Sequence, residues 1–221
     1  MTELMLVRHA LPVSGVVDPE LSETGVAQAE LLADWLANER VDALYTSPYK
    51  RARSTAAPVA QRLGLAATVV EDLREWDHEV SSPLVYTPLE EFDPTDPRAI
   101  AIAEGRFEDF VPELDLPAFQ ERATSAIDSL FERHPSGRIV AVSHGGIINA
   151  YLALLMESPR VFWFNPGYTS ISRVRRTSIG NVVVESVNET AHLVAVRRQA
   201  DGAVQSGGGS SGSMSGSGSR A

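Results

Sequence analysis

Short apolar runs alternate along the chain with segments whose apolar residues recur at helical spacing. The runs lie at 4–7, 41–45, 67–70 and 138–142. The first is unbroken, as is typical of a strand buried on both faces of a parallel sheet, and the others indicate further short strands. Helical spacing predicts helices at 22–38, 48–63, 116–133 and 147–156. Two further segments, 169–175 and 181–187, predict a closing hairpin.

Two of the predicted helices begin with start signals. Ser22 is an N-cap residue type, and apolar positions follow it at Val26, Ala29, Leu32, Ala33 and Leu36. Ser47 precedes Pro48, which predicts that Ser47 caps the second helix and that Pro48 occupies its first position. Arg51 then falls in the first turns, where backbone N–H groups and the helix dipole attract anions.

Composition narrows the class of protein. The 221 residues are 43% apolar and 22% charged, which suits one globular domain with an insertion. The net charge of −10 argues against a nucleic-acid partner, and the absence of cysteine excludes disulfides, thiolate zinc sites and a cysteine nucleophile. The longest apolar stretch, 147–156, is too short to span a bilayer. We therefore expect a cytoplasmic protein with no signal peptide and no membrane partner.

Most of the negative charge lies in one segment. Between 71 and 115 there are fourteen acidic residues against three arginines, a balance of −11, so the rest of the chain is close to neutral. We expect one domain over 1–205 with an acidic lid or binding insert at about 72–115. Beyond Gln205 the chain is nearly all Gly and Ser, which predicts a disordered tail at 206–221.

Candidate chemistry follows two of the predicted strands. Arg8 and His9 end the first strand, and His144 follows the strand at 138–142. Open α/β sheets place ligand sites at the carboxyl ends of their strands, so both histidines are candidates for one site. Gly145 and Gly146 would let the backbone approach an anion at the next helix start. The alternative is that each histidine is merely structural. It is disfavoured because the same arrangement, a buried strand followed by a histidine, occurs twice.

Five motifs occur in order along residues 4 to 187: Val7-Arg8-His9; Leu21-Ser22-Glu23-Thr24-Gly25 with Gln28-Ala29; Ser47-Pro48-x-x-Arg51-Ala52-x-x-Thr55-Ala56; Leu73-x-Glu75; and Ser143-His144-Gly145-Gly146. Each motif alone is weak, but the ordered set is specific. The chain resembles the histidine phosphatase superfamily, in the branch that contains cofactor-dependent phosphoglycerate mutases and many small phosphatases.

The resemblance implies a three-layer α/β/α fold with a mostly parallel central sheet. It also implies a metal-independent, cofactor-free phosphatase in which His9 is the nucleophile and Glu75 the proton donor to the leaving group. Arg8, Arg51 and a protonated His144 would hold the phosphate oxygens, as phosphoryl transfer requires. Gly145 and Thr24 are further candidates for binding the substrate, a small-molecule phosphomonoester.

Two features depart from the pattern or leave it open. Ala10 follows the Arg-His pair where the family usually has Gly, and a side chain there disfavours a positive φ. Near Glu75 stand three other acids that could donate the proton, Asp72, Asp77 and Glu79. The spacing Leu73-x-Glu75 favours Glu75.

Three functions stay open at this level. Hydrolysis is favoured over a mutase reaction, because an acidic insert repels a bisphosphate. A catalytically inactive binding domain is the third, although such a domain has no reason to keep all of the site residues. The insert favours a leaving group that is weakly charged or cationic and partly apolar. The aromatic residues at 162–164 suit a packed core better than an interface. The oligomeric state, including a homodimer, stays open.

Overall fold

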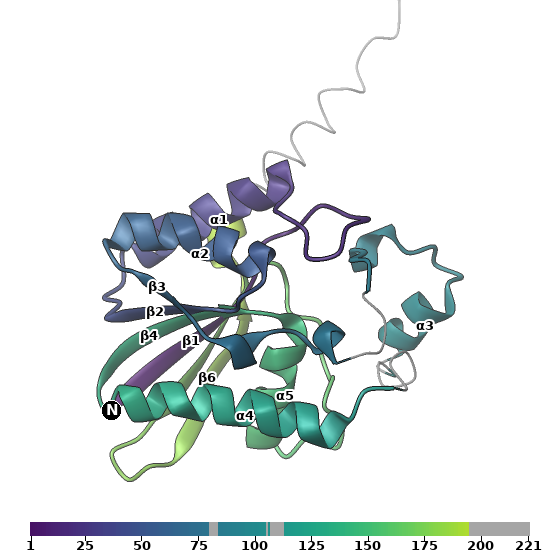
Figure 1. The fold of residues 1–221 in the computed structure, drawn as a ribbon. Coiled ribbons are helices and arrows are strands. Elements are labelled where there is room, and N and C mark those ends of the chain that lie inside the picture. Colours follow the sequence, from purple (N-terminus) through teal and green to yellow (C-terminus); the bar gives the residue numbers. More distant parts are fainter. Residues whose placement is uncertain (80–83, 105, 107–112, 195–221) are drawn as a thin grey trace, which may run out of the picture.

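A six-stranded mixed sheet forms the middle layer of the molecule (Figure 1). The computed structural model describes residues 1–79, 84–104, 106 and 113–194. In the order β3-β2-β4-β1-β5-β6, the strands are Ala67–Val69, Ala43–Thr46, Gly137–Ser143, Thr2–Arg8, Ile171–Arg176 and Val182–Glu189. The first four are parallel, while β5 and β6 form an antiparallel hairpin along β1. The predicted fold class is therefore confirmed.

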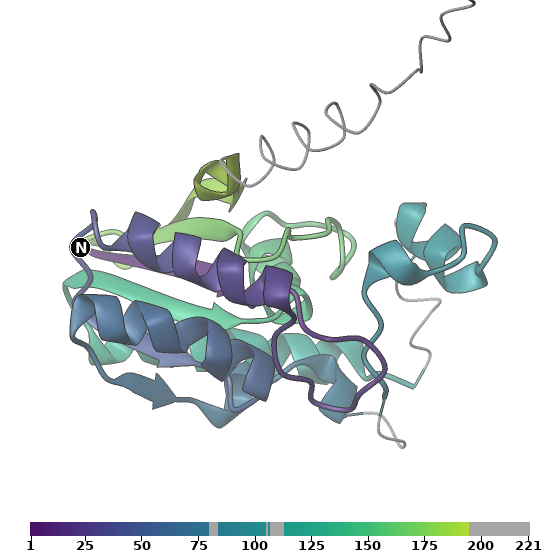
Figure 2. The ribbon, with the colours of Figure 1, turned by 90° about the horizontal axis from the view of Figure 1, so that it is seen from above.

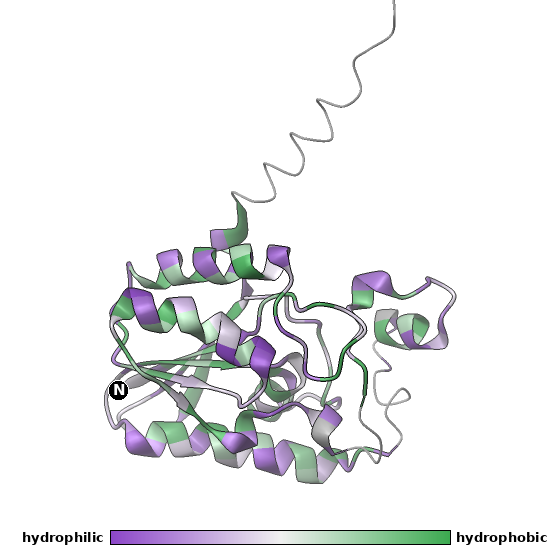
Figure 3. Cartoon of the chain, turned by 45° about the horizontal axis from the view of Figure 1, so that its top comes forward, coloured by the Kyte–Doolittle hydropathy of each residue, from purple (hydrophilic) through white to green (hydrophobic). Residues whose placement is uncertain are grey.

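Helices cover both faces of the sheet, as the two views in Figures 1 and 2 show. The helices α1 (Glu23–Leu36) and α2 (Lys50–Leu63) lie on one face. The helices α4 (Leu116–Arg133) and α5 (Gly145–Leu155) lie on the other. In Figure 3, α1, α2 and α4 carry hydrophobic and hydrophilic positions in alternation along their lengths, as expected of helices packed on one side.

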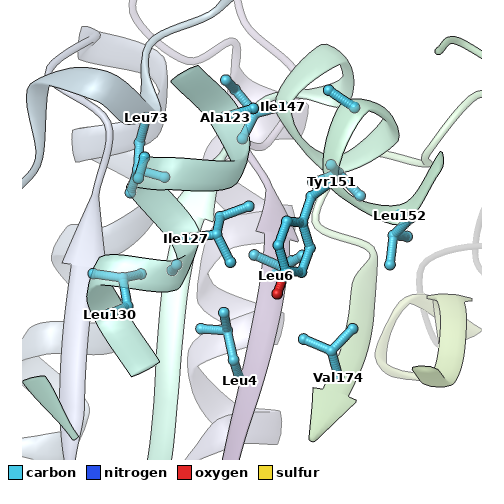
Figure 4. Packing of buried hydrophobic residues seen from close by; sticks show 14 of the residues in the cluster. Leu4, Leu6, Leu73, Ala123, Ile127, Leu130, Ile147, Tyr151, Leu152 and Val174 are labelled. Carbon is cyan, nitrogen blue, oxygen red and sulfur yellow. The ribbon is translucent and has the colours of Figure 1, made fainter. Parts of the chain in front are cut away.

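Alternate residues of β1 supply the two halves of the core. Leu4 and Leu6 point toward α4 and α5, where they meet Ile127 and Tyr151 (Figure 4). Met5 and Val7 point the other way, toward α1 and α2. These four side chains are fully buried, which explains why the middle of β1 is apolar without interruption.

Two sequence predictions about the helices are wrong. The second helix begins at Lys50 rather than at Pro48, and its N-cap residue is Tyr49 rather than Ser47. The Ser47 hydroxyl accepts from the Tyr49 N–H at 3.3 Å and lies 2.7 Å from Nε2 of His144. Ser22 caps α1 as predicted, with its hydroxyl accepting from the Gly25 N–H at 3.1 Å. Val26, however, is 53% exposed rather than buried.

The acidic segment after β3 has little regular structure in its described part. It holds 3-10 turns at Glu71–Leu73, Trp76–His78 and Leu89–Glu91 and one short helix, α3 (Pro97–Ala103). The segment with α3 stands beyond the carboxyl ends of the parallel strands (Figure 1). Another 3-10 turn, Ala191–Leu193, follows β6. No helix within the described residues is long and apolar enough to cross a membrane. The predicted tail at 206–221 lies outside the described residues.

Candidate active site

The register of two central strands brings His9 and His144 together. The strands β1 and β4 are parallel with Arg8 opposite Ser143, so the next residue of each strand emerges at the same edge. The His9 N–H donates to the Ser143 carbonyl at 2.9 Å. The two imidazole rings lie 5.1 Å apart between centroids, and both residues are buried.

The His9 ring is held in one tautomer. Its Nδ1 lies 2.8 Å from the carbonyl oxygen of Ala10, which can only accept a hydrogen bond. Nδ1 therefore carries the proton and Nε2 keeps its lone pair. Burial, followed by the charges of Arg51 and Arg8, holds the pKa of His9 well below its usual range. At neutral pH this ring is therefore uncharged.

Two buried arginines flank the histidines and are held by protein groups. Arg8 donates through Nη1 to the Pro166 carbonyl, and its guanidinium lies 4.0 Å from the centre of the Tyr168 ring. Arg51 donates through Nη2 to Asp77 at 3.1 Å, and its guanidinium lies over the Tyr49 ring. The site therefore places two fixed positive charges beside His9, an arrangement suited to an anion such as phosphate.

The Glu75 carboxylate sits at the N-terminus of α5. It accepts hydrogen bonds from the Gly146 N–H at 2.9 Å and from the Trp76 N–H at 3.1 Å. Burial, followed by repulsion from Asp77, raises the pKa of Glu75 to about 7. A carboxyl group with this pKa can both donate and accept a proton near neutral pH. Glycine at 146 leaves room for this carboxylate, because a Cβ there would clash with Glu75 Oε1 and displace it.

The other three acidic candidates have different surroundings. Asp72 is exposed, and Glu79 accepts from Arg122 Nε at 2.6 Å. Asp77 is engaged by Arg51. Only Glu75, among these four, combines burial with a raised pKa. The geometry therefore favours the residue that the sequence spacing favoured.

His144 is buried beside the same two arginines. Burial, followed by the proximity of Arg51, His9 and Arg8, holds the pKa of His144 well below its usual range. In the protein without ligand the ring is therefore neutral. The protonated His144 expected from the resemblance concerns the phosphate-bound state and stays a prediction. Nε2 contacts the Ser47 hydroxyl, and Nδ1 has no hydrogen-bond partner among the described residues.

Three further predicted positions have distinct outcomes. Gly145 lines the same cavity as His9 and Arg8. Thr24 is not brought to the cavity, because Gly25 packs against the Leu11 carbonyl and leaves Thr24 exposed in the first turn of α1. Ala10 is fully buried and does not adopt a positive φ, so its methyl group is accommodated without backbone strain.

Sequence reasoning missed several supporting residues. Arg122 of α4 donates through Nη1 to the carbonyls of Asp72 and Arg74, at 2.6 and 2.9 Å, and so fixes the backbone before Glu75. The hydroxyl of Tyr86, in the insert, is hydrogen-bonded to the Tyr168 hydroxyl at 2.9 Å. The centroids of the Tyr86 and His9 rings lie 6.0 Å apart. These contacts join segments far apart in the chain, so no local pattern signalled them.

These groups share one cavity of about 260 Å³, which is lined in part by Arg8, His9, Arg51, Glu75 and Gly145. It lies between the carboxyl edge of the parallel strands and the acidic insert, where α/β sheets place their ligand sites. No group of three or more His, Asp or Glu side chains that could hold a metal ion occurs in the described part of the chain. Fold and site together define an α/β phosphatase of the histidine type.

Comparison with known proteins places the chain within that class. The family model of the histidine phosphatase superfamily (branch 1) matches residues 4–190. Phosphoserine phosphatase 1 of Hydrogenobacter thermophilus is 33% identical over 202 residues, which cover 87% of this chain and 95% of that protein. The metal-independent phosphoserine phosphatase of Arabidopsis thaliana is 28% identical over 175 residues, which cover 72% of this chain and 71% of that protein.

A solved structure that is similar to this chain is also a phosphoserine phosphatase. It is a phosphoserine phosphatase mutant from Entamoeba histolytica in complex with phosphoserine, with a TM-score of 0.68 and 25% identity, covering 88% of this chain and 100% of that chain. The chain belongs to the histidine phosphatase superfamily, branch 1, and is a phosphomonoester hydrolase.

Proposed function

We propose that the protein hydrolyses a small-molecule phosphomonoester in two steps through a phosphohistidine on His9. In the first step, Nε2 of His9 forms a bond to phosphorus while the bond from phosphorus to the ester oxygen breaks. Glu75 gives its proton to the departing oxygen. In the second step, water attacks the phosphohistidine, Glu75 takes a proton from that water, and inorganic phosphate leaves.

One observation carries this proposal. A neutral imidazole with an unprotonated Nε2 and a carboxyl group with a pKa of about 7 line the same cavity. The two groups are therefore in the protonation states that the first step requires, at the same pH. Burial produces both shifts, since it disfavours the charged form of each group.

The phosphate oxygens would be bound by Arg8, Arg51, Nδ1 of His144 and the backbone at Gly145. Two buried guanidinium groups supply charge where the transition state is negative, which is the main requirement of phosphoryl transfer. Arg51 is paired with Asp77 in the structure, so substrate phosphate competes with this carboxylate for the guanidinium. A bound dianion would also favour protonation of His144.

Hydrolysis is favoured over the mutase alternative. A mutase grips a second anionic group, and the insert offers mainly carboxylates for that purpose. Among its described residues, Arg98 pairs with Asp96 and Arg106 with Glu104. An inactive binding domain is disfavoured because its charged groups would be buried without use. Metal independence is supported by the Arabidopsis thaliana relative, which is a metal-independent phosphoserine phosphatase.

The remaining predictions concern organisation. We propose a single domain over 1–205 with its insert at about 72–115, because the two halves of the core lie on the two faces of one sheet. The cytoplasmic location predicted from the sequence stays a prediction, and so does the choice between monomer and homodimer. The residues at 162–164 pack against the core, as the sequence favoured, with Phe162 only 5% exposed.

The direct test is to trap the intermediate. Wild-type protein mixed with 4-nitrophenyl phosphate and EDTA, then quenched in alkali, is expected to carry one phosphoryl group on the peptide that contains His9. Mass spectrometry of the digested protein locates the group. Turnover in EDTA with no phosphorylated histidine, or with the group on another residue, would contradict the proposed route.

Asp77→Asn is expected to change the pH profile without abolishing hydrolysis. Removing the nearby carboxylate lowers the pKa of Glu75, because two like charges no longer repel. Activity requires protonated Glu75, so the decline of kcat/KM at high pH should begin at lower pH, by on the order of half a unit. Inorganic phosphate should also inhibit more strongly, since Arg51 loses its nearer carboxylate and keeps only Asp18, at 3.9 Å.

The matched control for this variant is Asp72→Asn, an exposed position in the same segment whose profile should match wild type. Loss of the alkaline decline in Asp77→Asn, together with loss of most activity, would instead identify Asp77 as the proton donor.

A further inference from the structure

Beyond the phosphate-binding groups, the wall of the cavity that the insert supplies is apolar. Its side chains come from the segment before α3 and from α3 itself: Leu84, Val85, Leu89, Phe92 and Ile102. Figure 3 shows hydrophobic positions on α3, beyond the edge of the sheet. The insert is rich in carboxylates, yet its residues at this cavity are mainly apolar. This indicates a surface that binds an apolar group of the ligand.

Another part of the lining is aromatic and firmly held. It is formed by Phe162, Trp163 and Phe164. The Oδ1 atom of Asn149 accepts the N–H groups of Trp163 and Phe164, at 3.0 and 3.2 Å. Its Nδ2 donates to the Phe164 carbonyl at 2.9 Å. Phe162 also stacks on Phe119 of the core. This part of the lining is therefore fixed before any ligand arrives, which lowers the entropic cost of binding.

The charged groups of the cavity discourage a carboxylate on the leaving group. The Asp77 carboxylate lines it and would repel one. Within the described lining, the cation other than Arg8 and Arg51 is Arg98. Its guanidinium donates to both oxygens of Asp96, at 2.9 and 2.7 Å, and lies 4.4 Å from the centre of the Phe92 ring. A substrate carboxylate would have to compete with that pair.

We infer that the natural substrates are monoesters of a bulky apolar alcohol, carrying a ring or a branched chain, rather than of a small alcohol that bears a carboxylate. This inference rests on the proposed function, because it assigns the leaving group of the same reaction. A cavity of roughly 150 Å³ lined by Leu, Ile and Phe holds a benzene molecule. The 260 Å³ here therefore has room for a phosphoryl group and one ring.

The test compares alkyl phosphates whose alcohols have similar acidity, so that differences arise from binding. The substrates are 2-phenylethyl phosphate, ethyl phosphate and phosphoserine, and kcat/KM is measured for each in EDTA. We expect 2-phenylethyl phosphate to exceed both others by about 10- to 100-fold, the range that burial of a ring-sized apolar group gives. An equal or higher kcat/KM for phosphoserine would overturn the inference.

A pair of variants on one helix locates the effect. Ile102 lines the cavity, whereas Ile100 is 39% exposed and does not. Ile102→Asn places an amide in the apolar wall and is expected to reduce the preference for 2-phenylethyl over ethyl phosphate by about tenfold. Ile100→Asn should leave the preference and the activity unchanged. A preference that survives Ile102→Asn intact would overturn the assignment of this wall.

Failure of the inference and failure of the proposed function give different results. His9-dependent hydrolysis of 4-nitrophenyl phosphate without any preference for the phenylethyl ester refutes the substrate class and leaves the reaction in place. No hydrolysis of any of the four esters by folded protein refutes the reaction, and the inference with it. Thermal melts of both asparagine variants establish that each is folded.

Discussion

Replacing His9 with alanine is expected to lower kcat for every phosphomonoester by at least about 10³-fold, because the covalent step loses its nucleophile. Only water could then attack phosphorus, and Glu75, which is the base for water in the second step, is protonated for the first. The measurement is the release of 4-nitrophenol from 4-nitrophenyl phosphate in EDTA, over a pH range from about 4 to 8. No phosphorylated peptide should be trapped from this variant.

The control for His9→Ala is another histidine, at the opposite end of the sheet. His134 follows α4, its carbonyl accepts from the Thr2 hydroxyl, and its ring meets the Tyr45 hydroxyl at 2.7 Å. His134→Ala removes an imidazole far from the cavity and should leave kcat within about twofold of wild type. Comparable activity in wild type and His9→Ala would show that His9 is not the nucleophile.

The second large effect is expected for Glu75→Gln, and it should depend on the leaving group. An alkyl alcohol departs only with a proton, so kcat for ethyl phosphate should fall by about 10²- to 10⁴-fold. The nitrophenolate ion departs without one, so the first step with 4-nitrophenyl phosphate should be nearly preserved. The second step still needs a base for water, so the phosphohistidine should accumulate and give a burst of one equivalent of nitrophenol.

The pH dependence provides an independent test of the same residue. In wild type, kcat/KM for ethyl phosphate should decline above about pH 7, because the pKa of Glu75 is about 7 and only its protonated form donates. Glu75→Gln should lack that decline on top of its low activity. Glu71→Gln is the control, since Glu71 is exposed in the same segment. A decline that persists in Glu75→Gln would assign it to another group.

The elements that follow a simple period were the most predictable. The helix α4 begins and ends where the sequence indicates, with Pro117 in its first turn and Asp115 as its N-cap. The parallel strands agree to within a few residues, and β1 and β4, the two at the centre of the sheet, are apolar and sit between two helical layers. The positions of His9 and His144 after these strands were therefore predictable as well.

The errors occur where a distant residue overrides a local preference. Ser47 and Pro48 form a good helix start, yet the helix begins at Lys50, and the Ser47 hydroxyl contacts the distant His144 ring as well as the Tyr49 N–H. Val26 has helical spacing but lies on the exposed side of α1. The charge state of His144 depends on Arg51, His9 and Arg8, which only the folded chain brings near it.

The sequence by itself determined the succession of strands and helices along the chain, the histidines at two strand ends and the motifs that place the chain in its family. These features depend on neighbouring residues, through burial on one or two faces and through the local geometry of turns. The tertiary structure alone decided the His9 tautomer, the raised pKa of Glu75, the pairing of Arg51 with Asp77 and the apolar wall of the cavity. Each of these arises from groups far apart in the chain, and their electrostatic effects become large only when folding removes them from water.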